Sequence, residues 1–343
     1  MSQSVRIGVV GLGRMGATYC QIVANMRNVV LSGVCDVDLE RATEVAGRFG
    51  TSAYSTTEEL LDAGVDGIII ATSDNAHMEP TVAALERGVD VFLEKPLATS
   101  IEDATKIVDA ADASSAQLLV GHVCRFDPAY VAVRDAVAQR KFGQIRYVHA
   151  RRISTPGTLS RMGGRVSCVA YLGIHDIDLL HWMFDVQVRN VSAKAVRGIL
   201  GGVETELVIS STLEFDDGSI AVLENSWLRP DGPTTDKTAS MLVAGENGMA
   251  EITPFVSGSV MISDSGVALQ NQVYLDVSTP SGASGGLYAE EVDHFLAVIA
   301  RDAQLRCTAR EALRAVEVVA GIEESLASGS KVEIRPAMTG RHE

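Results

Sequence analysis

Four polar side chains suited to substrate binding or proton transfer lie at two places in the chain. Lys95 lies in the run Glu94-Lys95-Pro96, directly after an apolar segment that predicts a buried strand. A lysine at such a strand end can hold a substrate oxygen and favour its alkoxide form, and partial burial lowers the pKa of the ammonium group. Tyr171, His175 and Asp178 are spaced i, i+4 and i+7, which places them on one face of a helix. A histidine there can exchange a proton near neutral pH.

Each of these residues also has a purely structural interpretation. Lys95 can be a surface lysine that ends a strand, and His175 can cap or pair within the fold. Spacing alone does not separate the two interpretations, so the elements around these residues decide between them.

A glycine-rich turn near the start of the chain has the pattern of a dinucleotide site. The apolar run Val5–Val10 leads into a turn with glycines at 11, 13 and 16, and a helical segment, Ala17–Asn25, follows. Gly11 allows the tight turn, Gly13 lets the backbone approach a pyrophosphate, and Gly16 lets the helix pack closely on the strand. The unpaired N–H groups at the helix start then attract the phosphates.

The second half of this pattern is an acidic residue after the next strand. The apolar segment Val29–Cys35 ends at Asp36, 20 residues past Gly16, where a carboxylate accepts hydrogen bonds from ribose hydroxyls. The same carboxylate repels a 2′-phosphate. The sequence therefore predicts NAD rather than NADP as the cofactor.

Strands and helices alternate regularly over roughly the first 120 residues. This alternation predicts an α/β Rossmann domain with a doubly wound parallel sheet and helices on both faces. Ligands of such sheets bind outside the carboxyl ends of the strands, which is where Asp36, Lys95 and the glycine turn fall. The run from Thr56 to Glu59 predicts a capping box that opens a short helix.

The pattern changes from about residue 123 onward. A strand Ile145–Ile153, a polar loop Ser154–Ser167 and a helix Leu172–Phe184 are expected, and two helices end the chain, with a capping box at Thr308–Glu311. Between them, segments of alternating polarity predict a large, mostly antiparallel open sheet, giving an α+β domain. These segments are Val188–Val196, Glu206–Glu214, Ile220–Trp227, Lys237–Ala244, Met249–Thr253 and Ser259–Ser263. We therefore expect an NAD-binding domain at 1–123 and a substrate-binding and oligomerisation domain at 124–343.

Composition excludes several classes of function. The net charge of −15 argues against nucleic-acid binding, and no apolar run is long enough to span a membrane. The five scattered cysteines show no zinc-like spacing, so we expect no metal site and no disulfide framework, but buried reduced thiols in a cytoplasmic protein. The free face of a large sheet needs a cover, which a second copy of the chain can provide.

Taken together, the motifs resemble the glucose–fructose oxidoreductase/inositol dehydrogenase/rhizopine catabolism family (Gfo/Idh/MocA) over nearly the whole chain. The residues that carry the resemblance are Gly11 to Gly16, Asp36, Ala71-Thr72 with Asn75 and His77, Glu94-Lys95-Pro96, Gly121-His122 with Arg125-Phe126, and His175-Asp176-Ile177-Asp178. The resemblance implies NAD(P)-dependent chemistry on sugars, inositols or similar polyols, and assembly into homodimers or homotetramers through the sheet.

The resemblance also implies roles for individual residues. Lys95 would bind the reacting hydroxyl, and His175 would act as acid/base or hold the substrate. Residues expected at the cofactor are Gly11, Gly13, Arg14, Met15, Gly16, Asp36, Thr72, Asn75, His77, Glu94 and Lys95, and those expected at the substrate are Lys95, Arg125, Arg152, Tyr171, His175 and Asp178. Arg125 and Arg152 are also candidates for structural ion pairs.

One position departs from the family's pattern. Many polyol dehydrogenases of the family have aspartate four residues before the histidine, where this chain has Tyr171. The phenol either takes part in proton transfer, with a pKa lowered by the nearby ammonium group, or forms a wall against which a sugar ring stacks. We favour the wall, because His175 already supplies a group that titrates near neutral pH.

The sequence thus predicts an NAD-dependent dehydrogenase that oxidises a secondary hydroxyl of a cyclic polyol or sugar. Two alternatives stay open. One is an enzyme that keeps its NAD bound and uses it transiently, as an oxidoreductase couple or in glycosidic-bond cleavage. The other is a nucleotide-binding sensor that has lost the chemistry, because a fold alone does not fix a function.

Overall fold

The chain folds into two compact units in a computed structural model, which describes residues 4–231, 237–253, 258–263, 266–271 and 286–337. Of these, unit 1 holds residues 4–123, 286–313 and 337, and unit 2 holds 124–231, 237–253, 258–263, 266–271 and 314–336. The first change of unit follows residue 123. The sequence prediction differs in assigning 286–313 to the second domain, whereas the chain returns to unit 1 there.

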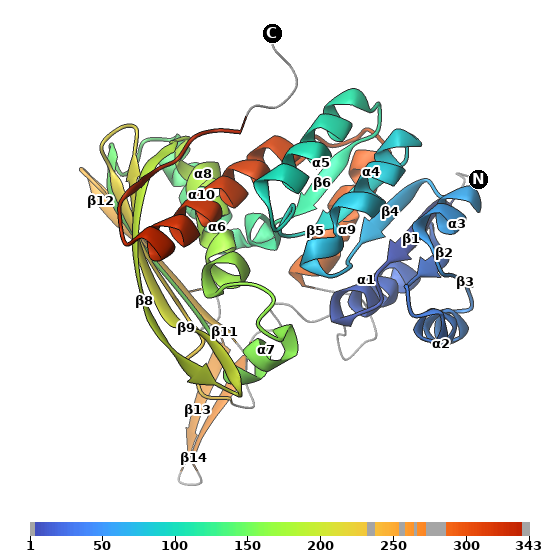
Figure 1. Ribbon diagram of the computed structural model, residues 1–343, viewed down its shortest axis with the longest axis horizontal. Helices are drawn as coiled ribbons and strands as arrows, with labels where there is room; N and C mark the ends of the chain where they lie inside the picture. The colour runs from blue at the N-terminus through green and yellow to red at the C-terminus, as the bar shows by residue number, and fades with distance from the viewer. Residues whose placement is uncertain (1–3, 232–236, 254–257, 264–265, 272–285, 338–343) are drawn as a thin grey trace. The chain divides into compact units, whose positions relative to one another are not determined.

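Unit 1 is a six-stranded parallel sheet with the strand order β3-β2-β1-β4-β5-β6 (Figure 1). The strands are β1 (Val5–Val10), β2 (Val29–Cys35), β3 (Ser52–Tyr54), β4 (Gly67–Ile70), β5 (Asp90–Glu94) and β6 (Leu118–Gly121). The helices are α1 (Arg14–Asn25), α2 (Leu39–Phe49), α3 (Thr57–Asp62), α4 (Met78–Glu86), α5 (Ile101–Ala113) and α9 (Leu287–Ile299), with a 3-10 turn η1 (Asp74–Ala76). The order and direction of the strands confirm the predicted Rossmann sheet.

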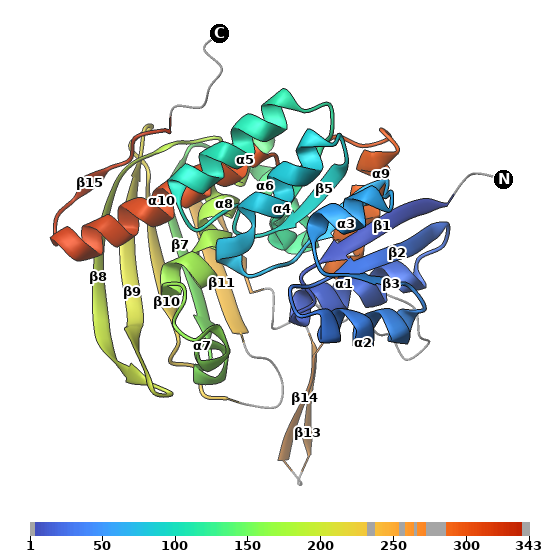
Figure 2. The ribbon, with the colours of Figure 1, turned by 45° about the vertical axis from the view of Figure 1, so that its right-hand side comes forward.

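Helices cover both faces of this sheet (Figure 2). Every residue of β4, β5 and β6 is buried, as expected for strands packed on two sides. On one face the core contains Tyr19 and Ile22 of α1 together with Val292 and Phe295 of α9, packed against Ile7 of β1 and other strand residues. This apolar packing is the reason that α9 belongs to unit 1 although it lies far along the chain.

The predicted helix starts in unit 1 have the expected caps. The Thr56 hydroxyl accepts a hydrogen bond from the Glu59 N–H, and the Glu59 carboxylate accepts one from the Thr56 N–H, so the capping box is confirmed. The same reciprocal bonds join Thr308 and Glu311, at 3.2 Å and 2.9 Å, and they confirm the second predicted capping box. Side-chain caps of this kind fix where the helices begin.

Unit 2 contains a seven-stranded mixed sheet in the order β12-β11-β7-β10-β9-β8-β15. The strands are β7 (Ile145–Ser154), β8 (Val188–Leu200), β9 (Val203–Phe215), β10 (Ile220–Ser226), β11 (Lys237–Gly245), β12 (Gly248–Ile252) and β15 (Val332–Glu333); β13 (Gly258–Ser263) and β14 (Gly266–Asn271) form a separate hairpin pair. The sheet is mostly antiparallel as predicted, and only β7 and β10 pair in parallel.

The helices of unit 2 lie on one face of this sheet. They are α6 (Pro128–Ala138), the π-helical segment η3 (Val169–Gly173), α8 (Ile174–Phe184) and the second part of α10 (Ala309–Ser328), while α7 (Pro156–Met162) follows β7 and the 3-10 turn η2 (Val123–Phe126) precedes α6. The Ser325 hydroxyl on α10 accepts a hydrogen bond of 3.0 Å from the Ala193 N–H of β8. Among the described residues, no helix is long and apolar enough to cross a bilayer.

Two local predictions in unit 2 were wrong. The segment predicted as a loop, Ser154–Ser167, contains the helix α7, which starts at the Thr155 cap with proline in its first turn and ends at Gly163 in the left-handed conformation. The helix predicted to begin at Leu172 is preceded by the π-helical segment η3, which contains Tyr171. The wider turn changes the register before α8, so an ideal α-helical spacing does not hold from Tyr171 to His175.

Candidate active site

The glycine turn between β1 and α1 forms an open cradle. A Cβ atom on Gly16 would overlap the carbonyl oxygen of Gly11, and Gly11 itself has φ +83° with its hypothetical Cβ 2.5 Å from the Thr72 backbone nitrogen. In contrast, a Cβ on Gly13 would meet no atom within 4 Å. Two glycines are therefore required by the fold, and the third leaves free space beside the start of α1. That space is where a pyrophosphate would approach the backbone.

The first turn of α1 suits an anion. Gly13 is the N-cap and has no side chain to cap the helix, and the first turn contains no acidic residue. N–H groups and the positive end of the helix dipole are therefore available to negatively charged ligands. The predicted cofactor residues Arg14 and Met15 lie on this turn, with Arg14 exposed and Met15 half-buried.

Asp36 closes the other side of the turn, directly after β2. One carboxylate oxygen accepts the Leu12 N–H at 2.7 Å, and the other accepts the Asp38 N–H at 3.0 Å. The Arg41 guanidinium lies 3.6 Å from the same carboxylate. A carboxylate offers about four lone-pair sites, so these two bonds leave acceptor capacity for ribose hydroxyls. Asp36 thus ties the glycine turn to β2 and fits the predicted ribose site.

Lys95 follows β5, and two neighbouring groups fix its backbone. Its N–H donates to a carboxylate oxygen of Glu94 at 3.0 Å, and the other Glu94 oxygen accepts the Tyr19 hydroxyl at 2.6 Å. The Lys95–Pro96 peptide bond is cis. The buried His77 ring bonds the Pro96 carbonyl through Nδ1 at 2.7 Å. Since a carbonyl oxygen only accepts, this His77 nitrogen carries the hydrogen.

The remaining predicted cofactor residues of unit 1 lie in the loop after β4. The Thr72 hydroxyl donates to the Ala76 carbonyl at 3.0 Å, and the exposed Asn75 lies within the turn η1. His77 is 2% exposed. Burial is the main cause that lowers its pKa, so the ring is neutral and serves the backbone of the Pro96 loop.

His175 lies in the first turn of α8 in unit 2 and is buried. Its Nδ1 lies 3.9 Å from the sulfur of Cys124, and burial raises the pKa of that thiol to about 11. The thiol therefore stays protonated at neutral pH and is the donor in this contact. In the neutral imidazole, Nδ1 then accepts and Nε2 carries the hydrogen.

Tyr171 packs within an aromatic group that sequence reasoning missed. Its ring stacks on Trp227, with centroids 5.6 Å apart and planes 30° from parallel, and the Lys237 ammonium nitrogen lies 5.4 Å from the Tyr171 ring centroid. Neither Trp227 nor Lys237 belongs to a local motif. They reach Tyr171 only because the strand order places β10 and β11 on either side of β7.

Two buried ion pairs account for four polar residues near His175. Arg125 donates to both oxygens of Asp178, at 3.0 Å and 2.7 Å, and each side chain is 1% exposed. Arg152 donates to Asp176 at 2.7 Å and 3.1 Å, and both side chains are buried. The two predicted substrate arginines therefore have the structural partners that the ion-pair interpretation expects. If Arg125, Arg152 or Asp178 contacted a substrate, the contact would have to use charged groups that are already engaged in these ion pairs.

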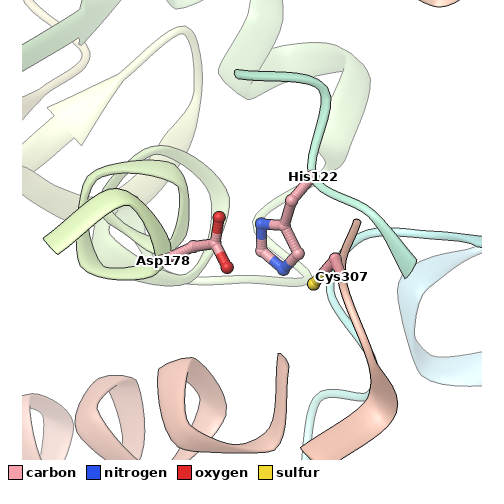
Figure 3. A group of neighbouring side chains, drawn as sticks. All are labelled: His122, Asp178 and Cys307. Atoms are coloured by element: carbon pink, nitrogen blue, oxygen red, sulfur yellow. The ribbon is translucent and has the colours of Figure 1, made fainter. Parts of the chain in front are cut away.

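Figure 3 labels the side chains of His122, Asp178 and Cys307. Cys307 and Asp178 each have a partner within their own unit. Cys307 precedes α10 in unit 1, and its sulfur lies 3.7 Å from the Thr308 carbonyl oxygen. Its own carbonyl accepts the Val120 N–H at 3.1 Å, which places it beside β6 and thus near His122 of the same unit. Asp178, in unit 2, has both oxygens engaged by Arg125.

Comparisons with known proteins identify the family. Residues 5–122 match the family GFO_IDH_MocA, described as an oxidoreductase family with an NAD-binding Rossmann fold, and residues 130–251 match its GFO/IDH/MocA C-terminal domain. The chain belongs to this family. Unit 1 therefore contains the family's NAD-binding domain, in agreement with the open glycine turn and Asp36.

The relatives include proteins named as inositol dehydrogenases. Myo-inositol 2-dehydrogenase of Thermotoga maritima is 30% identical over 236 residues, which cover 65% of this chain and 68% of that protein. Inositol 2-dehydrogenase 3 of Saccharopolyspora erythraea is 32% identical over 200 residues, 57% of each chain, so this match spans less than two thirds of the relative.

Solved structures confirm the fold over nearly the whole chain. The scyllo-inositol dehydrogenase from Lactobacillus casei with bound NAD(H) and scyllo-inositol has a TM-score of 0.83 at 18% identity, covering 96% of this chain and 99% of that chain. A probable dehydrogenase from Thermotoga maritima has a TM-score of 0.82 at 22% identity, with the same coverage of both chains.

Proposed function

We propose that this protein is an NAD-dependent dehydrogenase that oxidises a secondary hydroxyl of a cyclic polyol, with an inositol as the first candidate. One observation carries the proposal. The open dinucleotide cradle and Lys95, which follows β5, lie at the same edge of the unit 1 sheet. The kinship with inositol dehydrogenases supports the substrate class.

The cofactor fits the residues present. The space at Gly13 and the uncapped start of α1 would hold the pyrophosphate, and the spare acceptor sites of Asp36 would hold the adenosine ribose. When bound, NAD supplies the acceptor for a hydride from the carbinol carbon. The Arg41 guanidinium approaches the Asp36 carboxylate to 3.6 Å, and an acidic side chain at this place disfavours the 2′-phosphate of NADP.

Lys95 has the central chemical role in the proposal. Its ammonium group donates a hydrogen bond to the substrate hydroxyl oxygen and stabilises the alkoxide that forms as the proton leaves. The lysine side chain is half-buried, and its backbone is held by Glu94. Because the backbone is held, the positions that the ammonium group can reach are restricted. A lysine on a mobile surface segment would lack this restriction.

His175 and Tyr171 complete the proposed machinery in unit 2. His175 exchanges the substrate proton through Nε2 or holds the substrate, because Nδ1 is occupied by the Cys124 thiol. Tyr171 serves as an apolar wall for the ring of the substrate, a role supported by its stacking on Trp227. The phenol as a proton carrier is the competing hypothesis.

Assembly and location follow from the same interpretation. The strands of unit 2 expose large apolar side chains that include Val196, Ile220 and Met249. We propose that a second copy of the chain covers this sheet surface, giving a homodimer or homotetramer. The five cysteines are buried thiols that are not joined in disulfides, and this suits the reducing cytoplasm that we propose for the protein.

A substrate screen tests the proposal. The purified protein is incubated with inositol isomers, aldoses and sugar acids in the presence of NAD or NADP, and the absorbance of the reduced cofactor is followed. We expect NAD-dependent reduction with at least one cyclic polyol. Bound NAD that is reduced and reoxidised without net NADH release would instead favour the internally cycling alternative. The absence of any reduction together with tight NAD binding would favour the sensor.

A further inference from the structure

A buried hydrogen-bonded chain connects helix α1 to the backbone of Lys95. The Tyr19 hydroxyl, on α1, donates to one Glu94 oxygen at 2.6 Å, and the Lys95 N–H donates to the other at 3.0 Å. Glu94 is the last residue of β5. Both of its oxygens are therefore used to join the end of this strand to the helix that starts at the dinucleotide cradle.

Aromatic packing holds the Tyr19 ring in one place. The side chain is fully buried, and its ring meets Phe92 of β5 edge-on at 5.2 Å and Tyr288 of α9 at 6.2 Å. Phe92 in turn lies 5.9 Å from Phe295. Edge-to-face contacts of this kind fix the orientation of a ring. The Tyr19 hydroxyl is therefore already held at Glu94 before substrate binds.

A second carboxyl group faces the same cluster from α9. Glu291 is fully buried, and neither of its oxygens has a hydrogen-bond partner among the residues that the structure describes. Burial, and then the charge of Glu94, raise the pKa of Glu291 well above its usual value. This shift favours the neutral form of Glu291, while the Glu94 carboxylate accepts the hydrogen bonds of Tyr19 and Lys95.

We propose that Tyr19 is a positioning residue for the dehydrogenase reaction, acting through Glu94 to fix the backbone from which the Lys95 ammonium group extends. This inference rests on the proposed function of Lys95. It goes further in assigning a role to Tyr19, which touches neither substrate nor cofactor in the proposal and belongs to none of the motifs. Helix α1 and the Lys95 backbone are thus joined through the two oxygens of Glu94.

The physical reason is that a hydrogen bond to a charged acceptor is short, directional and strong in a dry environment. Without the Tyr19 donor, the buried Glu94 carboxylate loses the hydrogen bond of 2.6 Å to the Tyr19 hydroxyl, and it can rotate away from the Lys95 N–H. A displacement of the reacting group by about 1 Å can lower the rate of a reaction roughly hundredfold. The effect should fall on the chemical step, because the cradle that holds the cofactor is unchanged.

The main test compares Tyr19→Phe with Tyr130→Phe. Both tyrosines are fully buried, but the Tyr130 hydroxyl has no hydrogen-bond partner among the described residues, so its removal controls for the loss of a buried hydroxyl. We expect Tyr19→Phe to lower the single-turnover rate of NADH formation roughly ten- to hundredfold, with the dissociation constant of NAD changed less than twofold. Tyr130→Phe should leave both values near those of the wild type.

Two results would overturn the inference. A Tyr19→Phe variant with weakened NAD binding and an unchanged single-turnover rate would show that Tyr19 only supports α1. Equal rates in both variants would show that the Tyr19 hydroxyl does nothing for the reaction. A double-mutant cycle with Glu94→Gln adds a check, because the two substitutions should be less than additive if they break the same link.

A readout independent of activity separates this inference from the proposed function. Hydrogen–deuterium exchange of the peptide that contains the Lys95 amide should accelerate in Tyr19→Phe and not in Tyr130→Phe. If the wild type oxidises no polyol, the proposed function fails, and faster exchange still confirms the link from Tyr19 to Lys95. Unchanged exchange in Tyr19→Phe refutes the link, whatever the activity.

Discussion

Alanine at Gly13 and at Gly16 should have opposite effects on stability and on NAD binding. A Cβ on Gly13 meets no protein atom within 4 Å, and the residue has φ −68° and ψ −162°, which alanine can adopt. A Cβ on Gly16 overlaps the carbonyl oxygen of Gly11, a backbone atom that cannot rotate away. One site is thus open toward a ligand and the other is closed by the fold.

The magnitudes follow from these two environments. Gly13→Ala should keep or raise the free energy of unfolding, by up to about 1 kcal/mol, because alanine restricts the unfolded chain. The same methyl group occupies the space of the pyrophosphate, so NAD affinity should fall at least tenfold, or about 1.4 kcal/mol. Gly16→Ala must push α1 away from β1, and the strain should lower the free energy of unfolding by about 1–3 kcal/mol or more.

Thermal unfolding without cofactor and calorimetric titration with NAD measure the two quantities. The expected result is a stable Gly13→Ala variant that has lost NAD affinity and a destabilised Gly16→Ala variant. A Gly13→Ala variant that binds NAD as tightly as the wild type would refute the placement of the pyrophosphate. Equal destabilisation by both substitutions would refute the described turn.

Three further substitutions test other parts of the site. Asp36→Asn should lower the ratio of kcat/KM for NAD over NADP at least tenfold, because an amide does not repel a 2′-phosphate; an unchanged ratio in cofactor kinetics would contradict the role of Asp36. Tyr171→Phe keeps the ring stacked on Trp227 and should lower kcat less than tenfold, and a larger loss would assign proton transfer to the phenol. Asp176→Ala leaves the Arg152 guanidinium buried without its counter-charge, so urea unfolding should show a loss of about 3–5 kcal/mol, and a loss below about 1 kcal/mol would contradict the buried pair.

Much of unit 1 could be predicted because its signals are local. The glycine turn, Asp36 and the Glu-Lys-Pro run each lie at the end of an apolar strand, and the strand ends of a parallel sheet share one edge. The capping boxes at Thr56 and Thr308 depend on side chains three residues apart, so they too can be found in the sequence.

The features that were missed depend on packing between distant segments. Helix α9 joins unit 1 through Val292 and Phe295, a contact that no local pattern indicates. Trp227 reaches Tyr171 only through the order of the strands, and Tyr19 reaches Glu94 across 75 residues. Helix α7 is different, because its proline start and glycine end were present in the sequence but were taken for a polar loop.

The ion pairs of unit 2 show where residue type alone misleads. Arginine and aspartate beside a histidine suggest a polar substrate site, but a bidentate buried pair satisfies the same groups without any ligand. Only the distances distinguish the two cases. The sequence could name Arg125 and Asp178 as polar candidates, and it could not reveal that they are partners of each other.

The role of Lys95 is tested most directly by the rate of NADH formation in Lys95→Met, with Lys106→Met as the control. Lys106 is a half-exposed lysine of α5 paired with Glu102 and Asp103, so its loss removes a charge outside the proposed site. With an inositol that the wild type oxidises, Lys95→Met should lose at least about a hundredfold in kcat while still binding NAD, and Lys106→Met should match the wild type. A Lys95→Met variant that keeps its kcat would contradict the proposed mechanism.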